Sequence, residues 1–408
     1  MYKDHLLHLT IVIIALCTCF TPMQAQHFDI SSNKKRVSIP FRYVRNMVII
    51  QMNINERGPF NFVLDTGVGL MIITDPALVD SLNITNKHTV KIPGLGEGED
   101  AEAYVTNPLD IDIPGLKSYH VAAAILKKDH FHLSNFIGMP VHGLLGYEFF
   151  NRLAVQINFP DSSITVTRPY DIKVLAKGIK VPMTIEEKKP YIHAKVTLPD
   201  GSVSVAKLIV DLGAGHPVSL DNIIQKKGLP QKFIIANLGI GLNGPISGFI
   251  SRINEIDIGG YKIKQPLASF PDDKRNIIPS VSRDGNLGLQ ILKRFKIVFD
   301  YSGNALYLKK ASGFNAPFEH DMSGLEYYTT GENRKHIIIS RVEPGSPGYE
   351  IGIEKDDEIV AINFKPVWQM SLEQIDNLFR SKEGRNLLLE IYHDKKYDKV
   401  VLTLNRRI

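Results

Sequence analysis

A short apolar run that ends in Asp-x-Gly occurs twice in this chain, and it constrains the fold more than any other feature. Residues 60–64 precede Asp65-Thr66-Gly67, and residues 207–210 precede Asp211-Leu212-Gly213. Branched and aromatic residues favour buried strands, and Asp-x-Gly favours the tight turn that ends a strand. An ionised carboxylate beside so much apolar sequence is costly unless several donors meet it. Each copy therefore predicts a carboxylate held in a turn at the end of a buried strand.

The segments that follow the two turns also match. Leu144-Leu145-Gly146 aligns with Asn286-Leu287-Gly288, and the register continues without a gap from residues 153–166 to residues 295–308. The two aspartates are 146 residues apart (211 − 65) and the two Leu-Gly steps are 142 apart (288 − 146). Units of a solenoid are far shorter than this. The repeat therefore predicts one duplicated lobe, with one aspartate from each copy.

This pattern resembles the aspartic proteases of the pepsin and retropepsin type, over roughly residues 37–310. The resemblance implies a mainly β, bilobal fold with double-psi-type β-barrel lobes. It also implies a catalytic pair, Asp65 and Asp211, with Thr66, Gly67 and Gly213 supporting the site. Single-lobe retropepsins must dimerise to complete such a site. This chain carries both lobes, so we expect a monomer to be sufficient.

Paired carboxylates have a definite chemistry. Two carboxylates close together cannot both ionise, so they share one proton. The ionised one can take a proton from a water molecule, and the protonated one can donate to the scissile carbonyl oxygen. This hydrolyses a peptide bond with no covalent intermediate, no metal and no cofactor. The expected function is therefore that of an aspartic-type endopeptidase.

The second turn departs from the family pattern. Leu212 stands where the family places a hydroxyl that hydrogen-bonds to the opposite lobe, so half of this bracing is missing. Val68 and Ala214 also lack a hydroxyl that acid-working pepsins often place after the glycine. Losing donors to the carboxylates raises their pKa values, so we expect activity nearer neutral pH than that of pepsin. The alternative is a catalytically weak or inactive peptide-binding protein.

Two glycine-rich tips lie at matching distances from the two aspartates. Gly94, Gly96 and Gly98 begin 29 residues past Asp65 (94 − 65), and Gly239, Gly241 and Gly244 begin 28 residues past Asp211 (239 − 211). Retropepsin-like lobes carry a β-hairpin flap in about this place, and glycine suits a tip that approaches a peptide backbone closely. Simple flexible surface hairpins are the alternative. The second tip also fits a dinucleotide-binding pattern, which Pro245 and the lack of a periodic helix argue against.

The C-terminal part has a different character. A strand at residues 336–342, a Pro-Gly-Ser-Pro stretch at 344–347, a helix at 372–380 and two further strands follow one another in the order of bacterial PDZ domains. The resemblance covers residues 318–408 and predicts a small α+β domain. Such domains add a peptide C-terminus to a sheet edge. By resemblance, Gly324, Leu325 and Glu326 would line the carboxylate-binding loop, and the helix would form the other wall. A purely structural domain that packs on the protease is the alternative.

The N-terminus predicts export. Lys3 precedes an apolar run over residues 9–20, which is too short to span a bilayer and suits a secretory signal with cleavage near Ala25. Both cysteines, Cys17 and Cys19, lie within it, so the mature chain would have no disulfide. We expect a signal peptide over 1–25, lobes over 37–170 and 171–315, and the PDZ domain over 318–408. The expected location is periplasmic or secreted, with attachment to a membrane surface left open.

Composition and motifs argue against several other functions. The 408 residues carry a formal charge of +5 without a basic run of nucleic-acid character. No His-Glu-x-x-His and no Gly-x-Ser-x-Gly occur, so zinc proteases and α/β-type serine hydrolases are not indicated. His216 is interpreted as an ordinary loop or surface residue. His130 and His132 flank Phe131 at a spacing compatible with one strand face, and without a suitably spaced carboxylate or cysteine they are interpreted as non-ligands. The expected partners are protein or peptide substrates and peptide C-termini, not nucleic acid.

Overall fold

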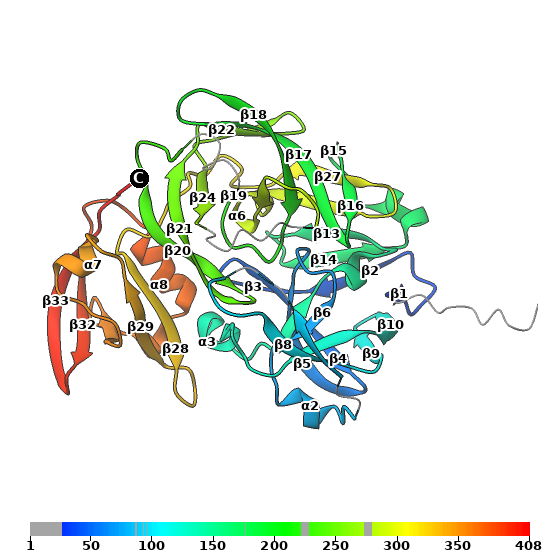
Figure 1. The fold of residues 1–408 in the computed structure, drawn as a ribbon, viewed down its shortest axis with the longest axis horizontal. Helices are drawn as coiled ribbons and strands as arrows, with labels where there is room; N and C mark the ends of the chain where they lie inside the picture. Colours follow the sequence, from blue (N-terminus) through cyan, green and yellow to red (C-terminus); the bar gives the residue numbers. More distant parts are fainter. Residues whose placement is uncertain are drawn as a thin grey trace, which may run out of the picture.

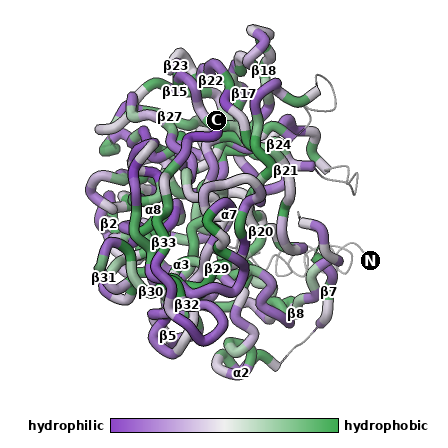
Figure 2. Tube along the Cα trace, turned by 90° about the vertical axis from the view of Figure 1, so that its left-hand side faces the viewer, coloured by the Kyte–Doolittle hydropathy of each residue, from purple (hydrophilic) through white to green (hydrophobic). Residues whose placement is uncertain are grey.

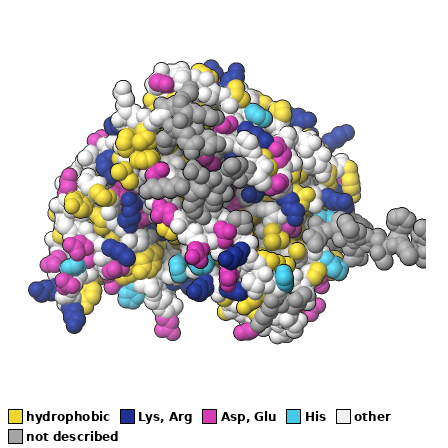
Figure 3. Space-filling model, in the orientation of Figure 1, with side chains coloured by type: hydrophobic (Ala, Val, Ile, Leu, Met, Phe, Trp, Pro, Cys, Tyr) yellow, Lys and Arg dark blue, Asp and Glu magenta, His cyan; other side chains and the backbone are white. Residues whose placement is uncertain are grey.

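The computed structural model describes residues 27–85, 88–92, 94, 96–175, 177–221, 228–272 and 280–408 (Figure 1). The predicted signal segment, with Cys17 and Cys19, lies outside these ranges. The fold is mainly β, with two lobes and a small C-terminal α+β domain, as the sequence predicted. On the face seen in Figure 3, basic and acidic side chains are interspersed, which is typical of a solvated surface. Within the described ranges, no helix is long and apolar enough to cross a bilayer.

One large sheet forms the first lobe. Its path is β1-β10-β9-β4-β5-β12-β6-β11-β8-β7, with β3 beside β4. The strands are β1 (Asp29–Ile30), β3 (Arg42–Val44), β4 (Met47–Ile54), β5 (Arg57–Leu64), β6 (Met71–Ile73), β7 (His88–Ile92), β8 (Ala101–Val105), β9 (Leu109–Ile113), β10 (Leu116–Val121), β11 (Ala123–Leu126) and β12 (Gly143–Leu145). Three short helices accompany them: α2 (Leu78–Ser81), α3 (Leu133–Ile137) and α4 (Tyr147–Phe150).

The second lobe repeats this plan. Its sheet runs β20-β21-β24-β19-β25-β18-β17-β22-β23, with β16 beside β17. The elements are β16 (Thr184–Glu186), β17 (Lys189–Thr197), β18 (Val203–Val210), β19 (Val218–Leu220), β20 (Ile234–Gly241), β21 (Gly244–Arg252), β22 (Glu255–Ile258), β23 (Tyr261–Lys264), β24 (Leu267–Pro271), β25 (Gly285–Leu287) and the helix α6 (Leu289–Leu292). In both lobes the strand before the aspartate runs parallel to the strand of the Leu-Gly step: β5 with β12, and β18 with β25.

Strands from both lobes form a third sheet, in the order β15-β27-β26-β13-β14-β2. Its members are β2 (Arg36–Pro40), β13 (Ala154–Asn158), β14 (Ser163–Thr167), β15 (Ile179–Pro182), β26 (Phe295–Asp300) and β27 (Ala305–Lys310), and the 3-10 helix η1 (Pro169–Val174) leads from one lobe to the other. Gln156 pairs with Val298, and these residues are 142 apart (298 − 156), the same offset as the two Leu-Gly steps. The pseudo-two-fold axis between the lobes therefore passes through this pair.

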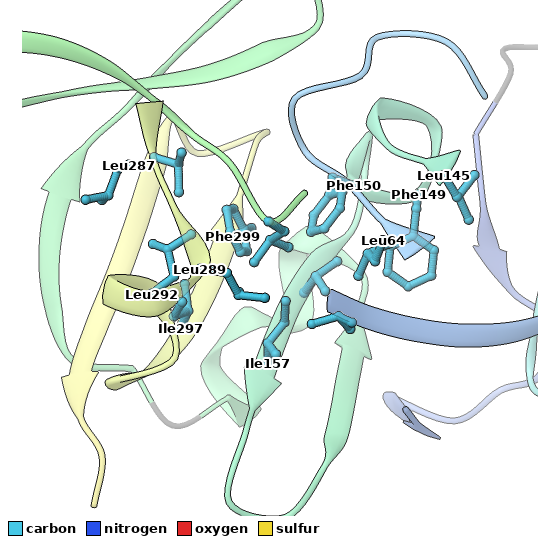
Figure 4. Close-up of a cluster of buried hydrophobic side chains, with 14 of the residues drawn as sticks. Leu64, Leu145, Phe149, Phe150, Ile157, Leu287, Leu289, Leu292, Ile297 and Phe299 are labelled. Atoms are coloured by element: carbon cyan, nitrogen blue, oxygen red, sulfur yellow. The ribbon is translucent and has the colours of Figure 1, made fainter. Parts of the chain in front are cut away.

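The hydrophobic core is continuous across that axis. Figure 4 shows Phe150 of the first lobe facing Phe299 of the second, with Leu64 and Leu145 on the first-lobe side and Leu289 on the second-lobe side of one buried cluster. The rings of Phe150 and Phe299 lie 5.1 Å apart between centroids in an edge-on arrangement, and both are fully buried. Because aromatic rings bury large apolar areas, this shared core fixes the two lobes against each other.

The C-terminal domain has a separate core and a sheet in the order β28-β29-β30-β32-β33, with β31 beside β30. Its elements are β28 (Leu325–Thr330), β29 (His336–Val342), α7 (Pro347–Glu350), β30 (Glu358–Ile362), β31 (Lys365–Pro366), η2 (Val367–Gln369), α8 (Leu372–Phe379), β32 (Asn386–His393) and β33 (Lys396–Thr403). Ser371 caps α8 in a capping box with Gln374. The outer strand β33 is largely hydrophilic (Figure 2), and β28 is the opposite edge of the sheet.

Local geometry sets two turns and one helix end. The β4–β5 turn holds only Asn55 and Glu56, both at positive φ, because β5 already begins at Arg57. The helix α2 begins at Leu78, after the Asp75 carboxylate accepts the N–H of Ala77. The helix expected to reach Arg380 ends at Phe379.

Candidate active site

Each aspartate lies where a buried strand passes into its turn. The N–H of Asp65 donates to the carbonyl of Leu145, and the N–H of Asp211 donates to the carbonyl of Leu287, both at 2.9 Å. The strand of the Leu-Gly step therefore holds the aspartate backbone in each lobe. A side chain at Gly146 would overlap the carbonyl oxygens of Asp65 and Val68 in the first turn. Only glycine therefore allows the chain to pass this close to the turn. The repeated Leu-Gly step thus has a direct role in placing the carboxylates.

Backbone amides of the turns meet the carboxylates. Gly67 donates its N–H to Oδ1 of Asp65 at 2.7 Å. Oδ1 of Asp211 accepts two, from Gly213 at 2.9 Å and from Ala214 at 3.2 Å. The turn chemistry that the sequence predicted is therefore present in both lobes, with one more amide in the second.

The structure brings the two predicted aspartates together. A Cβ atom on Gly213 would overlap the carboxylate of Asp65, and one on Gly67 would lie 2.9 Å from Oδ2 of Asp211. Each carboxyl group also shifts the pKa of the other, as expected of two groups close enough to share one proton. Each glycine therefore makes room for the other lobe's carboxylate, which requires glycine in both turns.

One hydroxyl links the two turns. Thr66 donates from Oγ1 to the carbonyl of Val210 at 2.6 Å and accepts the N–H of Leu212 at 3.0 Å. Both partners flank Asp211. Leu212 offers no hydroxyl in return, and its side chain is fully buried in the core. The cross-lobe bracing is therefore one-sided, and the single hydroxyl contacts both sides of the opposite aspartate.

Asn286 is a site residue that the sequence analysis did not select. Its Nδ2 donates to Oδ2 of Asp211 at 2.8 Å. The signal was present in the sequence: in the otherwise apolar Leu-Gly step of the first lobe the corresponding residue is Leu144, and a buried amide in place of leucine usually has a hydrogen-bond partner. Asn286 departs from the apolar pattern of the step because it supplies a donor to Asp211.

The two carboxyl groups have unequal surroundings. Burial raises the pKa of Asp65 well above its usual value, and the negative charge of Asp211 raises it further. Burial also raises the pKa of Asp211, but the Gly213 amide, the positive charge of Arg283 and a hydrogen bond from Asp65 oppose that rise. Among the described residues, Asp211 accepts from three groups outside the pair and Asp65 from one, so ionisation is favoured at Asp211.

The two glycine-rich tips meet each other. Glu97 and Gly98 of the first tip donate their N–H groups to the carbonyls of Pro245 and Asn243, at 3.1 and 2.7 Å. The Asn243 side chain donates to Asp100 at 3.0 Å. Gly96 lies so close to the second tip that a Cβ would stand 2.5 Å from the carbonyl of Gly244. Leu95, which precedes Gly96, lies outside the described residues.

The second tip is docked on the first lobe rather than free. Leu242 is buried in a hydrophobic cluster whose other members all belong to the first lobe. Asn243 beside it is also buried. Gly94 packs against Leu242 so closely that a Cβ there would overlap it. These contacts favour paired flaps over loose surface hairpins, although their role as a cover stays a prediction.

Two hairpin turns, related by the pseudo-two-fold axis, reach across to the opposite site. A Cβ atom added to Gly215 would lie 3.6 Å from the Cβ of Asn46 in the β3–β4 turn. A Cβ atom added to Gly69 would lie 3.1 Å from the Cβ of Lys188 in the β16–β17 turn. Both turns adopt positive φ at their two central residues. Each turn therefore supports the loop that carries the other lobe's aspartate.

The prediction for His216 can be placed. His216 lies in the second aspartate loop and is partly buried, with no hydrogen-bond partner for Nε2 among the described residues. Burial lowers its pKa to about 4. It was expected to be an ordinary loop residue, and it does lie in a loop. The described residues contain no group of three or more His, Cys, Asp or Glu side chains arranged to hold a metal ion.

Comparisons with known proteins match two segments of the chain. Residues 50–149 match the family model described as aspartyl protease, and residues 338–392 match that of the PDZ domain. The first range includes Asp65 but ends before Asp211, and the second begins after β28. Among solved structures, the aspartic proteinase from Irpex lacteus is similar at 13% identity and a TM-score of 0.45, covering 69% of this chain and 99% of that one. A search of curated proteins gives no significant match. The predicted combination of an aspartic-protease-like part with a PDZ domain is thereby confirmed.

Proposed function

We propose that this chain is an exported aspartic endopeptidase in which Asp65 and Asp211 hydrolyse peptide bonds through one shared proton and an activated water. The observation that carries the proposal is the contact between two turn carboxylates, one from each lobe, each facing the other lobe's glycine. The family match to residues 50–149 supports a peptidase. Both halves of the site come from one chain, so a monomer is sufficient.

The donors around the pair suggest a division of roles. Asp211, which accepts from Gly213, Ala214 and Asn286, is the ionised member and takes a proton from the attacking water. Asp65 holds the shared proton and donates it to the carbonyl oxygen of the scissile bond. The tetrahedral diol that forms is neutral.

Collapse of this diol completes the cycle. Asp211 passes its new proton to the leaving nitrogen, and Asp65 regains a proton from a diol hydroxyl as the carboxylic acid forms. One water molecule is consumed, and the pair returns to its starting state. Donors placed in advance around Asp211 lower the cost of its charge, which is how electrostatic preorganisation assists a reaction.

The surroundings of the two carboxyl groups also favour catalysis at a pH nearer neutral than that of pepsin. Burial raises the pKa of both carboxyl groups. Val68 and Ala214 have no hydroxyl group that could donate to the carboxylates and lower these pKa values again. The reaction needs one ionised member, so activity should fall as pH drops below the pKa at which the pair becomes doubly protonated. A pH–rate profile with its maximum well below pH 4 would contradict this.

Digestion of a peptide library tests the proposal. Cleavage that disappears in both Asp65→Asn and Asp211→Asn supports the enzyme, and inhibition by pepstatin would add to it. The alternative is a catalytically weak or inactive protein that binds peptides. It predicts no cleavage by the wild type and peptide binding that both variants retain. Thermal unfolding of each variant shows whether lost activity reflects lost folding.

Export is the part of the proposal that rests on the sequence alone. The apolar run before Ala25 supports a signal segment. Expression of the full chain followed by fractionation and N-terminal sequencing tests it. A mature N-terminus near residue 26 in the periplasm or medium is the expected result. A cytoplasmic protein that keeps its first residues would refute it.

A further inference from the structure

The groove of the C-terminal domain lies between the edge strand β28 and the helix α8, where PDZ domains hold a peptide. In this chain the groove contacts the first lobe. The helix α3 packs along β28, and Oγ1 of Thr329 donates to the carbonyl of Asn135 at 2.8 Å. A Cβ on Gly138, at the end of α3, would lie 2.9 Å from Leu372 at the start of α8. One segment of the first lobe therefore touches both walls.

Arg45 fills the middle of the same groove. From the tip of the β3–β4 turn, its Nη1 donates to the carbonyl of Tyr327 on β28 at 3.1 Å and to the carbonyl of Phe136 at 2.8 Å. Nη2 and Nε donate to the carboxylate of Asp376 on α8 at 3.1 and 3.3 Å. The guanidinium also lies between the rings of Phe136 and Tyr327, 4.5 and 4.6 Å from their centroids.

This ion pair is well protected. The side chains of Arg45 and Asp376 are 8% and 15% exposed. Arg45 occupies an acceptor on the strand edge that an added peptide strand would use, and at the same time it binds the opposite wall. A buried, bidentate guanidinium with two stacked rings is a strong contact, so an incoming peptide would have to displace it.

The loop expected to receive a peptide carboxylate is also occupied. Oδ1 of Asp321 accepts the N–H groups of Ser323 and Gly324, both at 2.8 Å, and the Ser323 hydroxyl at 2.6 Å. The N–H of Leu325 donates to Oγ of Ser323 at 3.1 Å. Groups of the chain itself therefore use two amides predicted to bind a ligand: the Asp321 carboxylate binds that of Gly324, and the Ser323 hydroxyl binds that of Leu325. These contacts favour the alternative in which the domain packs on the protease.

The domain is fastened to the second lobe independently. Arg294, next to α6, donates to the carbonyls of Phe314 and Pro317 in the connecting segment and stacks on Phe318 at 3.5 Å. Beyond β33, Ile408 is buried in the core shared by the two lobes. Glu326 on β28 also accepts from Asn237 in the strand that leads to the second glycine tip, at 3.0 Å.

We propose that the β28–α8 groove is an intramolecular docking site whose ligand is the first lobe, namely the Arg45 turn and α3. The domain is fixed to the second lobe and binds the first, so it acts as a clamp across the two lobes. It does not bind free peptide C-termini. Asn46, next to Arg45, packs on Gly215 in the loop of Asp211. The clamp therefore acts within a few residues of one carboxylate.

Two measurements on the full mature chain test this, with Asp65→Asn present throughout so that no probe is cleaved. The first is fluorescence anisotropy with a library of labelled hexapeptides that end in a free carboxylate, and with the same peptides amidated. We expect no carboxylate-dependent saturation of the wild-type groove up to about 1 mM peptide. Saturable binding of the free acid at micromolar concentration, absent for the amide, would overturn the proposal.

The second measurement is hydrogen exchange of Arg45→Ala against Arg42→Ala, an exposed arginine on the same hairpin. Loss of a buried ion-pair partner should speed exchange in α3 and β28 by about tenfold or more, and the control should match the wild type. Equal exchange in the two variants would refute the clamp. Neither readout depends on proteolysis, so the clamp and the proposed activity can fail separately.

Discussion

The amide of Asn286 offers a sharp test of how the carboxylate pair divides its charge. Replacing Asn286 by leucine, the residue at the corresponding position 144 of the first lobe, removes the donor to Oδ2 of Asp211. The substitution should not harm the fold, because Oδ1 of Asn286 is buried without a partner among the described residues. Removing an unsatisfied buried polar atom removes its unfavourable desolvation free energy from the folded state.

The magnitude follows from the charge on the acceptor. A hydrogen bond to a charged group contributes about 1.5–3 kcal/mol, and about 1.4 kcal/mol corresponds to one pKa unit. Loss of this bond destabilises the ionised form of Asp211 and raises its pKa. The acidic limb of kcat/KM against pH should therefore move up by about one to two units in Asn286→Leu.

The assay is a pH–rate profile with a fluorogenic peptide, with the unfolding midpoint measured alongside. Leu144→Asn is the matched control, since it offers an amide to Asp65 in the same geometry and should move the limb the other way or leave it unchanged. An acidic limb that stays in place in Asn286→Leu, in a protein of unchanged stability, would refute the assignment of the charge to Asp211.

Three further substitutions test the interior of the lobes. Thr66→Val should lower the free energy of unfolding by about 1–3 kcal/mol in denaturant titration, because it removes both cross-lobe hydrogen bonds of the hydroxyl, and Thr66→Ser should recover most of the loss. Burial raises the pKa of Glu148 to about 7, so the native state loses stability as pH rises from about 4.5 to 7, and Glu148→Gln should gain about 3 kcal/mol over wild type at pH 8 but little at pH 4. Burial lowers the pKa of His216 to about 4, so the fold loses stability as pH falls from about 6.5 to 4, and His216→Asn should flatten this loss in unfolding experiments.

Much of the architecture could be predicted because the repeat carries geometric information. Matching strands on both sides of each Asp-x-Gly turn, at a constant offset of 142 residues in the tail, specify two related lobes with a shared sheet. Alternation of buried and exposed residues then places most strands to within a few residues. Turn lengths were less predictable, since the two-residue turn at Asn55 and Glu56 depends on positive φ at residues other than glycine.

The site was predictable where a motif repeats and not where the two copies differ. Asp65 and Asp211 follow from the repeat, whereas Asn286 stands out only when its difference from Leu144 is taken as a signal. The contacts of Arg45 could not be predicted at all. An arginine at a hairpin tip usually faces solvent, and only the packing of a third domain gives this one a buried carboxylate partner.

The differences between the lobes have a common physical sense. In a symmetric dimer the two aspartates have identical surroundings, so neither is favoured to carry the charge. In this chain the first lobe supplies the hydroxyl of Thr66, which holds the opposite turn, and the second lobe supplies the amide of Asn286, which holds the charge of its own aspartate. The first lobe thus stabilises the opposite turn, and the second lobe stabilises the negative charge of its own aspartate. Leu212 is then not simply a defect in the motif. Its side chain packs in the core, and its own turn is braced from the first lobe by Thr66. Duplication within one chain is what allows the two tasks to separate.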